Sequence, residues 1–247
     1  MPHIELDHVS LEFHVGAERH TTLQSAVWCG LRRHRVEART VTALKDLSLT
    51  IKSGERVGII GHNGAGKSTL LKVLAGIYPP QRGRVTIDGH VCPLFEFVTG
   101  FEMEATGWEN IRTRALLLGM SPKEIEKKID GIAAFSNLGE FLDIPVRHYS
   151  TGMFVRLAFA TSTAVDPQIL LLDEVMAAGD AAFIESARLR MNELMLRASI
   201  VVFASHSLDV LPTFCDRTIL LRHGQIVVDG PTAEVVRFYT SEESARA

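Results

Sequence analysis

The chain has 247 residues, 46% of them hydrophobic, and a formal net charge of −3 at pH 7. This length and composition allow a large core that needs no disulfide or metal, and the acidic balance argues against a general nucleic-acid binder. Three cysteines without metal-ligand spacing favour a reducing compartment. There is neither a run of about 18 apolar residues nor a signal peptide at the first residues, so we expect a cytoplasmic protein that does not span a membrane.

The first expected elements are strands that surround a glycine-rich segment. Residues 3–13 and 41–51 alternate apolar with polar side chains, which predicts two half-exposed strands. A third strand is expected at 83–89. This part of the chain therefore predicts a small β subdomain.

An insert of different composition lies at residues 16–41, between the first two strands. It holds five arginines against two glutamates in an otherwise acidic chain. Leu23, Val27 and Leu31 recur at every fourth position, as in a short amphipathic helix, and a basic cluster follows them. The simplest interpretation is a solvated basic face.

A complete phosphate-binding loop follows the apolar run at 57–60 and precedes an apolar helical pattern at 70–74. Strand, loop and helix are the context that this motif requires. Its glycines let backbone N–H groups turn toward phosphates, Lys67 places a charge on the β and γ oxygens, and the Ser68 hydroxyl can ligate magnesium. The expected nucleotide-binding residues are Gly61, His62, Asn63, Gly64, Ala65, Gly66, Lys67, Ser68 and Thr69.

The middle of the chain has a helical pattern, which predicts a helical subdomain at about 104–165. Ser121 to Glu124 form a capping box with Pro122 at the first helical position. A further helix is expected at 154–164.

Two compact apolar runs follow, at 169–172 and 199–204, with a helix at 183–197 between them. This βαβ order predicts a buried parallel sheet. Strands with a turn at His223 and Gly224 come next, and a C-terminal helix and tail occupy 231–247. We expect a single domain over 1–247.

Polar residues with catalytic potential end two of the buried strands. Asp173 and Glu174 follow the apolar run at 169–172, where a phosphate-loop ATPase would use Asp173 to hold magnesium through water and Glu174 to polarise the attacking water. His206 ends the other strand, at an edge from which it can reach a γ-phosphate. Alone, an acidic pair at the end of a strand is a common surface feature, and a lone histidine is more often structural.

The segment Tyr149-Ser150-Thr151-Gly152-Met153 opens the 154–164 helix and stands before the strand that ends at Asp173. Ser150 and the backbone N–H groups at this helix start can form a second anion site. Without the other motifs, the segment predicts only a helix N-cap.

With these motifs in order, the chain resembles the nucleotide-binding subunit of an ATP-binding cassette (ABC) transporter over nearly its whole length. Ser150 and Gly152 keep two positions of the signature motif. The segments Tyr149–Met153, Arg156–Phe159 and Asp173–Asp180 resemble those of the subfamily that exports bacterial polysaccharides.

The resemblance implies an α/β phosphate-loop NTPase with a RecA-like parallel sheet core, an antiparallel β subdomain and a helical subdomain. It implies ATP and Mg²⁺ as cofactors and a head-to-tail dimer with a second copy of the chain. ATP would lie between the phosphate loop of one copy and Ser150, Thr151 and Gly152 of the other. Lys67, Glu174 and His206 would be catalytic, and Asp180 would lie at the nucleotide.

Two site residues depend on the resemblance alone and leave alternatives open. Phe13 matches an aromatic residue that stacks on adenine, although an apolar residue at a strand end is also ordinary core. Glu96 stands where relatives usually carry a magnesium-contacting Gln. Glu96 is therefore a candidate metal ligand or a solvated loop residue.

The resemblance also implies partners. The chain is expected to be peripheral to the cytoplasmic face of the inner membrane and to drive a separate permease. The permease would export a lipid-linked polysaccharide, O-antigen first, with capsule or teichoic acid as further candidates. Residues 22–35 resemble the extra helix of such exporters, where basic residues would meet lipid head groups or the glycan pyrophosphate.

Two alternatives remain for function. One is a soluble ABC ATPase of DNA repair or translation, and the other is an ABC motor for a different substrate. We expect no nucleic-acid partner, because the long coiled-coil insertions and paired cassettes of the soluble relatives do not occur in this sequence.

Overall fold

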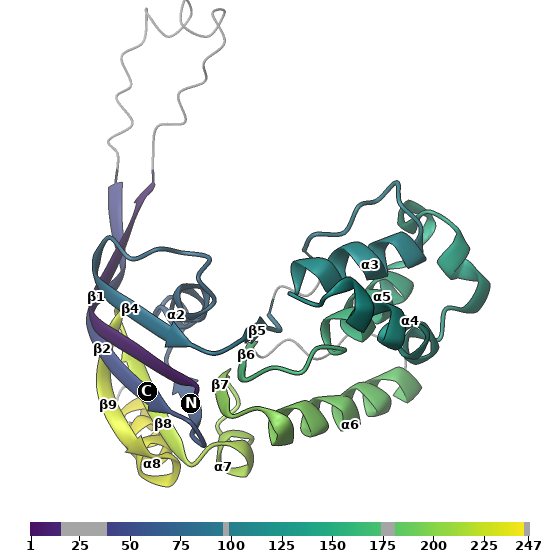
Figure 1. Cartoon of the computed structure of the whole chain (residues 1–247). Coiled ribbons are helices and arrows are strands. Elements are labelled where there is room, and N and C mark those ends of the chain that lie inside the picture. The colour runs from purple at the N-terminus through teal and green to yellow at the C-terminus, as the bar shows by residue number, and fades with distance from the viewer. Residues whose placement is uncertain (16–38, 96–98, 174–180, 245–247) are drawn as a thin grey trace, which may run out of the picture.

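The computed structural model describes residues 1–15, 39–95, 99–173 and 181–244. It contains two sheets and a helical part (Figure 1). In the described residues, every helix is too short or too polar to cross a membrane.

The smaller sheet is antiparallel, with the order β2-β1-β4. Its strands are β1 (His3–Val15), β2 (Arg39–Lys52) and β4 (Arg82–Asp88). The three predicted strands are confirmed, and β2 takes up the last residues of the expected insert. The rest of that insert, 16–38, lies outside the described residues.

The larger sheet has the order β5-β6-β7-β3-β8-β9 and is parallel except for its last strand. Its strands are β5 (Val91–Pro93), β6 (Ile169–Asp173), β7 (Ile200–Ala204), β3 (Arg56–Ile60), β8 (Arg217–Arg222) and β9 (Gln225–Pro231). The expected βαβ unit is present, with α6 (Ala181–Arg197) between β6 and β7.

The sheet is buried on both faces, as the continuous apolar runs of its strands predict. In β6, Ile169 and Leu171 pack with α2 (Lys67–Leu74) and the antiparallel sheet, whereas Leu170 and Leu172 pack with the helical part and α6. Successive side chains of a strand point to opposite faces. One strand therefore contributes to both cores.

The helical part consists of α3 (Gly107–Leu117), α4 (Pro122–Ser136) and α5 (Thr151–Ser162), which contact one another (Figure 1). Two short 3₁₀ helices, η1 (Gly139–Asp143) and η2 (Val146–His148), lead into α5. The predicted capping box at Ser121 is confirmed. Near the C-terminus, α7 (Leu211–Phe214) and α8 (Thr232–Ser244) pack on β3 and β8.

Candidate functional site

The phosphate loop joins β3 to α2, so it emerges from a strand whose last four residues are buried. Gly66 has φ +108° and forms the N-cap of α2. A Cβ atom at Gly66 would lie 2.7 Å from the carbonyl oxygen of Ala43 in β2. Only glycine combines this left-handed backbone with such a close approach. The β subdomain therefore packs directly on the loop.

The Lys67 side chain lies across the inside of this loop. Its ammonium group donates hydrogen bonds to the carbonyl oxygens of Gly61 at 2.6 Å and His62 at 3.2 Å, and the residue is buried. The backbone of the loop thus holds the charge at the N-terminus of α2. A helix N-terminus and an ammonium group together favour a phosphate.

The first turn of α2 meets the end of β6. The Ser68 hydroxyl donates a hydrogen bond to Asp173 Oδ2 at 3.0 Å. These residues are 105 positions apart in the chain, so the fold brings together the two predicted ligands. Glu96, the third residue predicted to hold a metal, lies outside the described residues.

His206 follows β7, the strand that pairs with both β3 and β6. Ala204 is in register with Ile59 on one side and Asp173 on the other. The Ser205 N–H donates to the Ile59 carbonyl oxygen at 3.2 Å, and its hydroxyl accepts from the Ser207 N–H at 2.9 Å. The turn that carries the exposed His206 is thus anchored beside the phosphate loop.

The β8–β9 turn also packs on the loop, a contact that no sequence pattern predicts. The Gly224 N–H donates to the Ala65 carbonyl oxygen at 2.9 Å, and the Lys45 N–H donates to the Gly224 carbonyl oxygen at 2.9 Å. The His62 and His223 rings lie with their centroids 5.0 Å apart. The sequence shows a turn at His223 and Gly224 but carries no signal for its contact with residues 160 positions earlier.

Phe13 is half-buried and lies opposite Val41 in the antiparallel pair of β1 and β2. Its ring meets Tyr78 edge-on, with centroids 5.4 Å apart. The strand continues to Val15, so the expectation that Phe13 ends it was wrong. Val41 is two residues from Ala43, whose carbonyl touches the loop. Phe13 is thus near the loop and also part of the local packing.

The signature segment begins α5. Ser150 is the N-cap, and its Oγ accepts a hydrogen bond from the Met153 N–H at 3.2 Å. The predicted cap is confirmed, but the expected helix boundaries were wrong, because α5 runs over Thr151–Ser162 rather than 154–164. An N-cap hydrogen bond starts the helix despite the poor helix formers Thr151 and Gly152.

The residue before the cap fixes the approach to α5. The Tyr149 hydroxyl donates to the Phe141 carbonyl oxygen at 2.6 Å in η1. Burial, and then the charge of Asp143, raise the pKa of Tyr149 to about 12. The phenol therefore stays protonated and donating at neutral pH.

Within one copy, the two halves of the predicted nucleotide site do not come together. Figure 1 shows α5 in the helical part, apart from α2 and the phosphate loop. Thr151 and Gly152 are with Ser150 at the start of α5. Glu174 and Asp180 lie outside the described residues, so their predicted roles remain predictions.

The comparisons with known proteins decide the family. The sequence profile described as "ABC transporter" matches residues 44–177. The chain belongs to the ABC transporter family. It is 48% identical, over 78% of its length and 80% of the relative's, to the O-antigen export system ATP-binding protein RfbE of Yersinia enterocolitica.

Two further curated relatives of the ABC protein are exporter subunits. It is 36% identical to the O-antigen export system ATP-binding protein RfbB of Klebsiella pneumoniae, over 96% of this chain and 97% of that one. It is 41% identical to the teichoic acids export ATP-binding protein TagH of Listeria innocua, over 80% of this chain and 58% of the relative.

Solved structures show the same fold. The structure titled "ATP binding subunit of ABC transporter" matches with a TM-score of 0.70 at 22% identity, over 96% of this chain and 93% of that one. A dimeric cassette in a post-hydrolysis state with ADP and Pi matches with a TM-score of 0.67 at 23% identity, over 93% and 98%. The predicted family, the phosphate-loop fold class and the ATPase class are confirmed.

Proposed function

We propose that this ABC ATPase hydrolyses ATP to power the export of a lipid-linked polysaccharide through a separate membrane permease. The observation that carries the cargo is the 48% identity to an O-antigen exporter subunit across 80% of that protein. O-antigen is the first candidate. Teichoic acid is the second candidate, because the alignment with the teichoic acids exporter subunit TagH covers only 58% of that protein.

The phosphate loop supplies the binding of ATP. Lys67 already lies inside the loop against the Gly61 and His62 carbonyl oxygens, where it can shift toward the β- and γ-phosphate oxygens. Phe13 is the candidate platform for adenine, since β1 and β2 run beside the loop. The remaining loop residues, from His62 to Thr69, would surround the phosphates with backbone N–H groups.

The residues present fit Mg²⁺. Ser68 Oγ lies 3.0 Å from Asp173 Oδ2, so an ion bound by the Ser68 hydroxyl would have this carboxylate beside it, where it could hold the ion through a water. The described residues contain no group of three or more His, Cys, Asp or Glu side chains that can hold a metal. Mg²⁺ suits a site with so few protein ligands, because it keeps several waters and binds substrate phosphates. When bound, it neutralises charge on the γ-phosphate.

Hydrolysis would follow from residues at the same edge of the sheet. Glu174 directly follows Asp173 and would orient and deprotonate the attacking water. His206, on the turn anchored to Ile59, would donate to the γ-phosphate. These roles rest on the strand order, in which β7 stands between β6 and β3.

A second copy would complete the site. Ser150, Thr151 and Gly152 begin α5, which lies apart from the phosphate loop of its own chain (Figure 1). The related cassette bound to ADP and Pi is dimeric. In a head-to-tail dimer, the N-terminus of α5 would meet the γ-phosphate on the partner's loop. Asp180 would lie at the same interface.

The permease supplies the membrane path, and the ATPase would associate peripherally with the cytoplasmic face. Residues 22–35 would contact the membrane surface or the glycan pyrophosphate through their arginines. The permease and the cargo would be identified by reconstituting the ATPase with candidate permeases and measuring glycan export.

The test of the ATP-dependent dimer is Glu174→Gln. We expect this variant to bind ATP normally, to hydrolyse it at least ~100-fold more slowly, and to form a stable dimer with Mg²⁺ and ATP, because the phosphate contacts remain while the base is lost. Light scattering measures the dimer, and phosphate release measures hydrolysis. Lys67→Ala in the same background is the control and should stay monomeric. Hydrolysis at the normal rate would show that Glu174 is not the base.

A further inference from the structure

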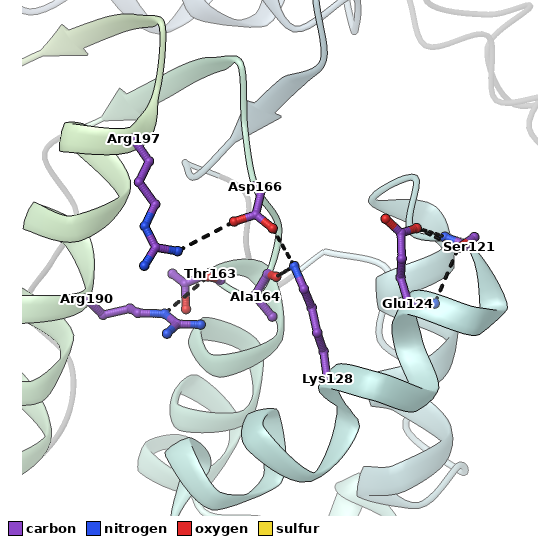
Figure 2. Close-up of polar contacts among 8 residues, drawn as sticks. All are labelled: Ser121, Glu124, Lys128, Thr163, Ala164, Asp166, Arg190 and Arg197. Carbon is purple, nitrogen blue, oxygen red and sulfur yellow. Dashed lines mark hydrogen bonds and ion pairs between the residues drawn. The ribbon is translucent and has the colours of Figure 1, made fainter.

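The C-terminal end of α5 is held by charged side chains from two other helices. The last carbonyl groups of a helix have no partners within the helix. Figure 2 shows that Lys128 from α4 reaches the carbonyl group of Ala164 and that Arg190 from α6 reaches the carbonyl group of Thr163. Asp166, in the segment between α5 and β6, lies between Lys128 and Arg197.

The contact from α4 is made by Lys128. Its ammonium group donates to the Ala164 carbonyl oxygen at 2.9 Å and to Asp166 Oδ2 at 2.6 Å. The hydrogen bond from Lys128 lowers the pKa of Asp166. On the same helix, the Ser121–Glu124 capping box fixes the first turn (Figure 2), so the helix that carries Lys128 has a defined start.

The contacts from α6 are made by two arginines. Arg190 Nε donates to the Thr163 carbonyl oxygen at 3.3 Å, and its guanidinium lies 5.6 Å from the centre of the Phe135 ring. Arg197 Nη1 is 3.7 Å from Asp166 Oδ1. The two oxygens of Asp166 are therefore divided between the helical part and α6.

These polar contacts border an open cavity at the edge of a packed apolar interface. The cavity has a volume of about 340 Å³ and is lined by residues of α4, α6 and the segment at 163–166. Buried apolar side chains pack beside it, among them Ile132 of α4, Leu194 of α6 and Ala164. The direction of α5 at this end therefore depends on this packing together with the ionic contacts.

This cluster lies on the segment that links the two halves of the nucleotide site. The segment at 163–168 joins α5, which begins next to Ser150, to β6, which ends at Asp173. The twelve residues of α5 span about 18 Å at 1.5 Å per residue. A tilt of about 3° at the held end would move the Ser150 end by about 1 Å. Displacements of about 1 Å can reduce catalytic rates ~100-fold.

We propose that Lys128, Asp166 and Arg197 are positioning residues that set the direction of the signature helix, so that its N-terminus meets the nucleotide on the partner copy. The inference rests on the proposed function, because it requires the ATP-dependent dimer. The three side chains are exposed by 35%, 66% and 65%. Ion pairs this exposed contribute little to stability, so their loss should act on dimer formation more than on folding.

The experiment compares variants in the Glu174→Gln background. Lys128→Met removes the charge and both hydrogen bonds but keeps an unbranched side chain, and Asp166→Asn removes the charge shared by the two helices. We expect either change to weaken ATP-driven dimerisation about 10-fold, because a dimer contains this cluster twice, while the ATP affinity of the monomer changes less than ~2-fold. Lys128→Arg should restore dimerisation to within ~3-fold of the parent. Sedimentation measures the dimer, and a fluorescent ATP analogue at low protein concentration measures binding.

Lys127→Met is the matched control. Lys127 precedes Lys128 in α4 and lines the same cavity, so this variant should dimerise like the parent. Dimerisation of both test variants at the parent's level would overturn the inference while leaving the proposed function intact. So would a parallel fall in ATP affinity, which indicates a general loss of structure. A parent that stays monomeric with ATP would overturn the dimer and the inference together.

Discussion

Gly66 and Gly224 come from distant parts of the chain and meet at one carbonyl oxygen, that of Ala43. A Cβ atom would lie 2.7 Å from this oxygen at Gly66 and 2.5 Å from it at Gly224. Gly224 also donates its N–H to Ala65 in the phosphate loop. Backbone atoms therefore hold the phosphate loop on two sides. The β8–β9 turn acts as a support for the nucleotide site.

Gly224→Ala should weaken ATP binding as well as stability. Gly224 has φ +76°, so an alanine costs about 1–2 kcal/mol of left-handed strain, and its methyl group would push the turn away from Ala43 and Ala65. Gly54→Ala is the control, because Gly54 has φ +94° but no atom within 4 Å of the added Cβ. Thermal melts and ATP titrations measure the two effects. Equal ATP affinity in both variants would contradict the supporting role of the turn.

Strands β1 and β2 are interrupted by a pair of facing bulges. His8 and Asp46 both have φ +50°, and the register shifts between Leu6 and Val9. The His8 ring nitrogen Nδ1 lies 2.7 Å from Asp46 Oδ1. The hydrogen bond to Asp46, followed by the charges of Asp46 and Asp7, raises the pKa of His8 above 6.5.

The stability of this sheet should therefore depend on pH. Because the folded state binds the His8 proton more tightly than the unfolded state, the stabilisation is fully present below pH 6.5 and is lost as the pH rises through the raised pKa. His8→Asn removes the imidazole but tolerates the left-handed backbone. Urea midpoints of the wild type and His8→Asn should differ most at low pH and converge at high pH. A difference that grows with pH would reverse the sign and contradict the assignment.

Elements with a strong local signal were predicted from the sequence. The capping box at Ser121, the buried runs of β6 and β7 and the phosphate loop each satisfy a local rule, so pattern and structure agree. The start of α5 was predicted three residues too late, because the Ser150 cap outweighs the weak helix propensity of Thr151 and Gly152. An N-cap residue stabilises a helix through one side-chain hydrogen bond to the first turn, and the helix propensities of the residues do not include this bond.

Contacts between distant segments could not be predicted in the same way. The hydrogen bond between Gly224 and Ala65, and the ion pairs of Asp166 with Lys128 and Arg197, join segments that carry no mutual pattern. The meeting of Ser68 with Asp173 was predictable only through the known geometry of phosphate-loop proteins. A sequence identifies residue types and elements, whereas these pairings depend on the strand order and on how helices pack.

The proposed dimer would have two composite sites, each with a phosphate loop from one copy and a signature helix from the other. Lys67→Ala damages the loop, and Ser150→Arg damages the signature. Each variant alone would have two damaged sites. A mixed dimer would have one site with both defects and one with none.

Mixing the two inactive variants should therefore restore ATP hydrolysis. Only the mixed dimer has an intact site, and this site can bind ATP and hold the two copies together. Because one of its two sites is active, we expect clearly more hydrolysis than either variant shows alone and at most about half of the wild-type rate, if the sites act independently. Phosphate release from the mixture, compared with each variant at the same total concentration, measures the effect. A mixture no more active than its components would contradict the composite site.

The sharing of β6 between the two cores limits how the molecule can be divided. Ile169 and Leu171 are buried on one side, and Leu170 and Leu172 on the other, all at 5% exposure or less. A fragment that stops before this strand would expose the apolar residues of the helical part that pack on it. A fragment that begins with this strand would carry an uncovered apolar face. An engineer who wishes to swap the signature region between exporters must therefore transplant or rematch both faces of a single five-residue strand.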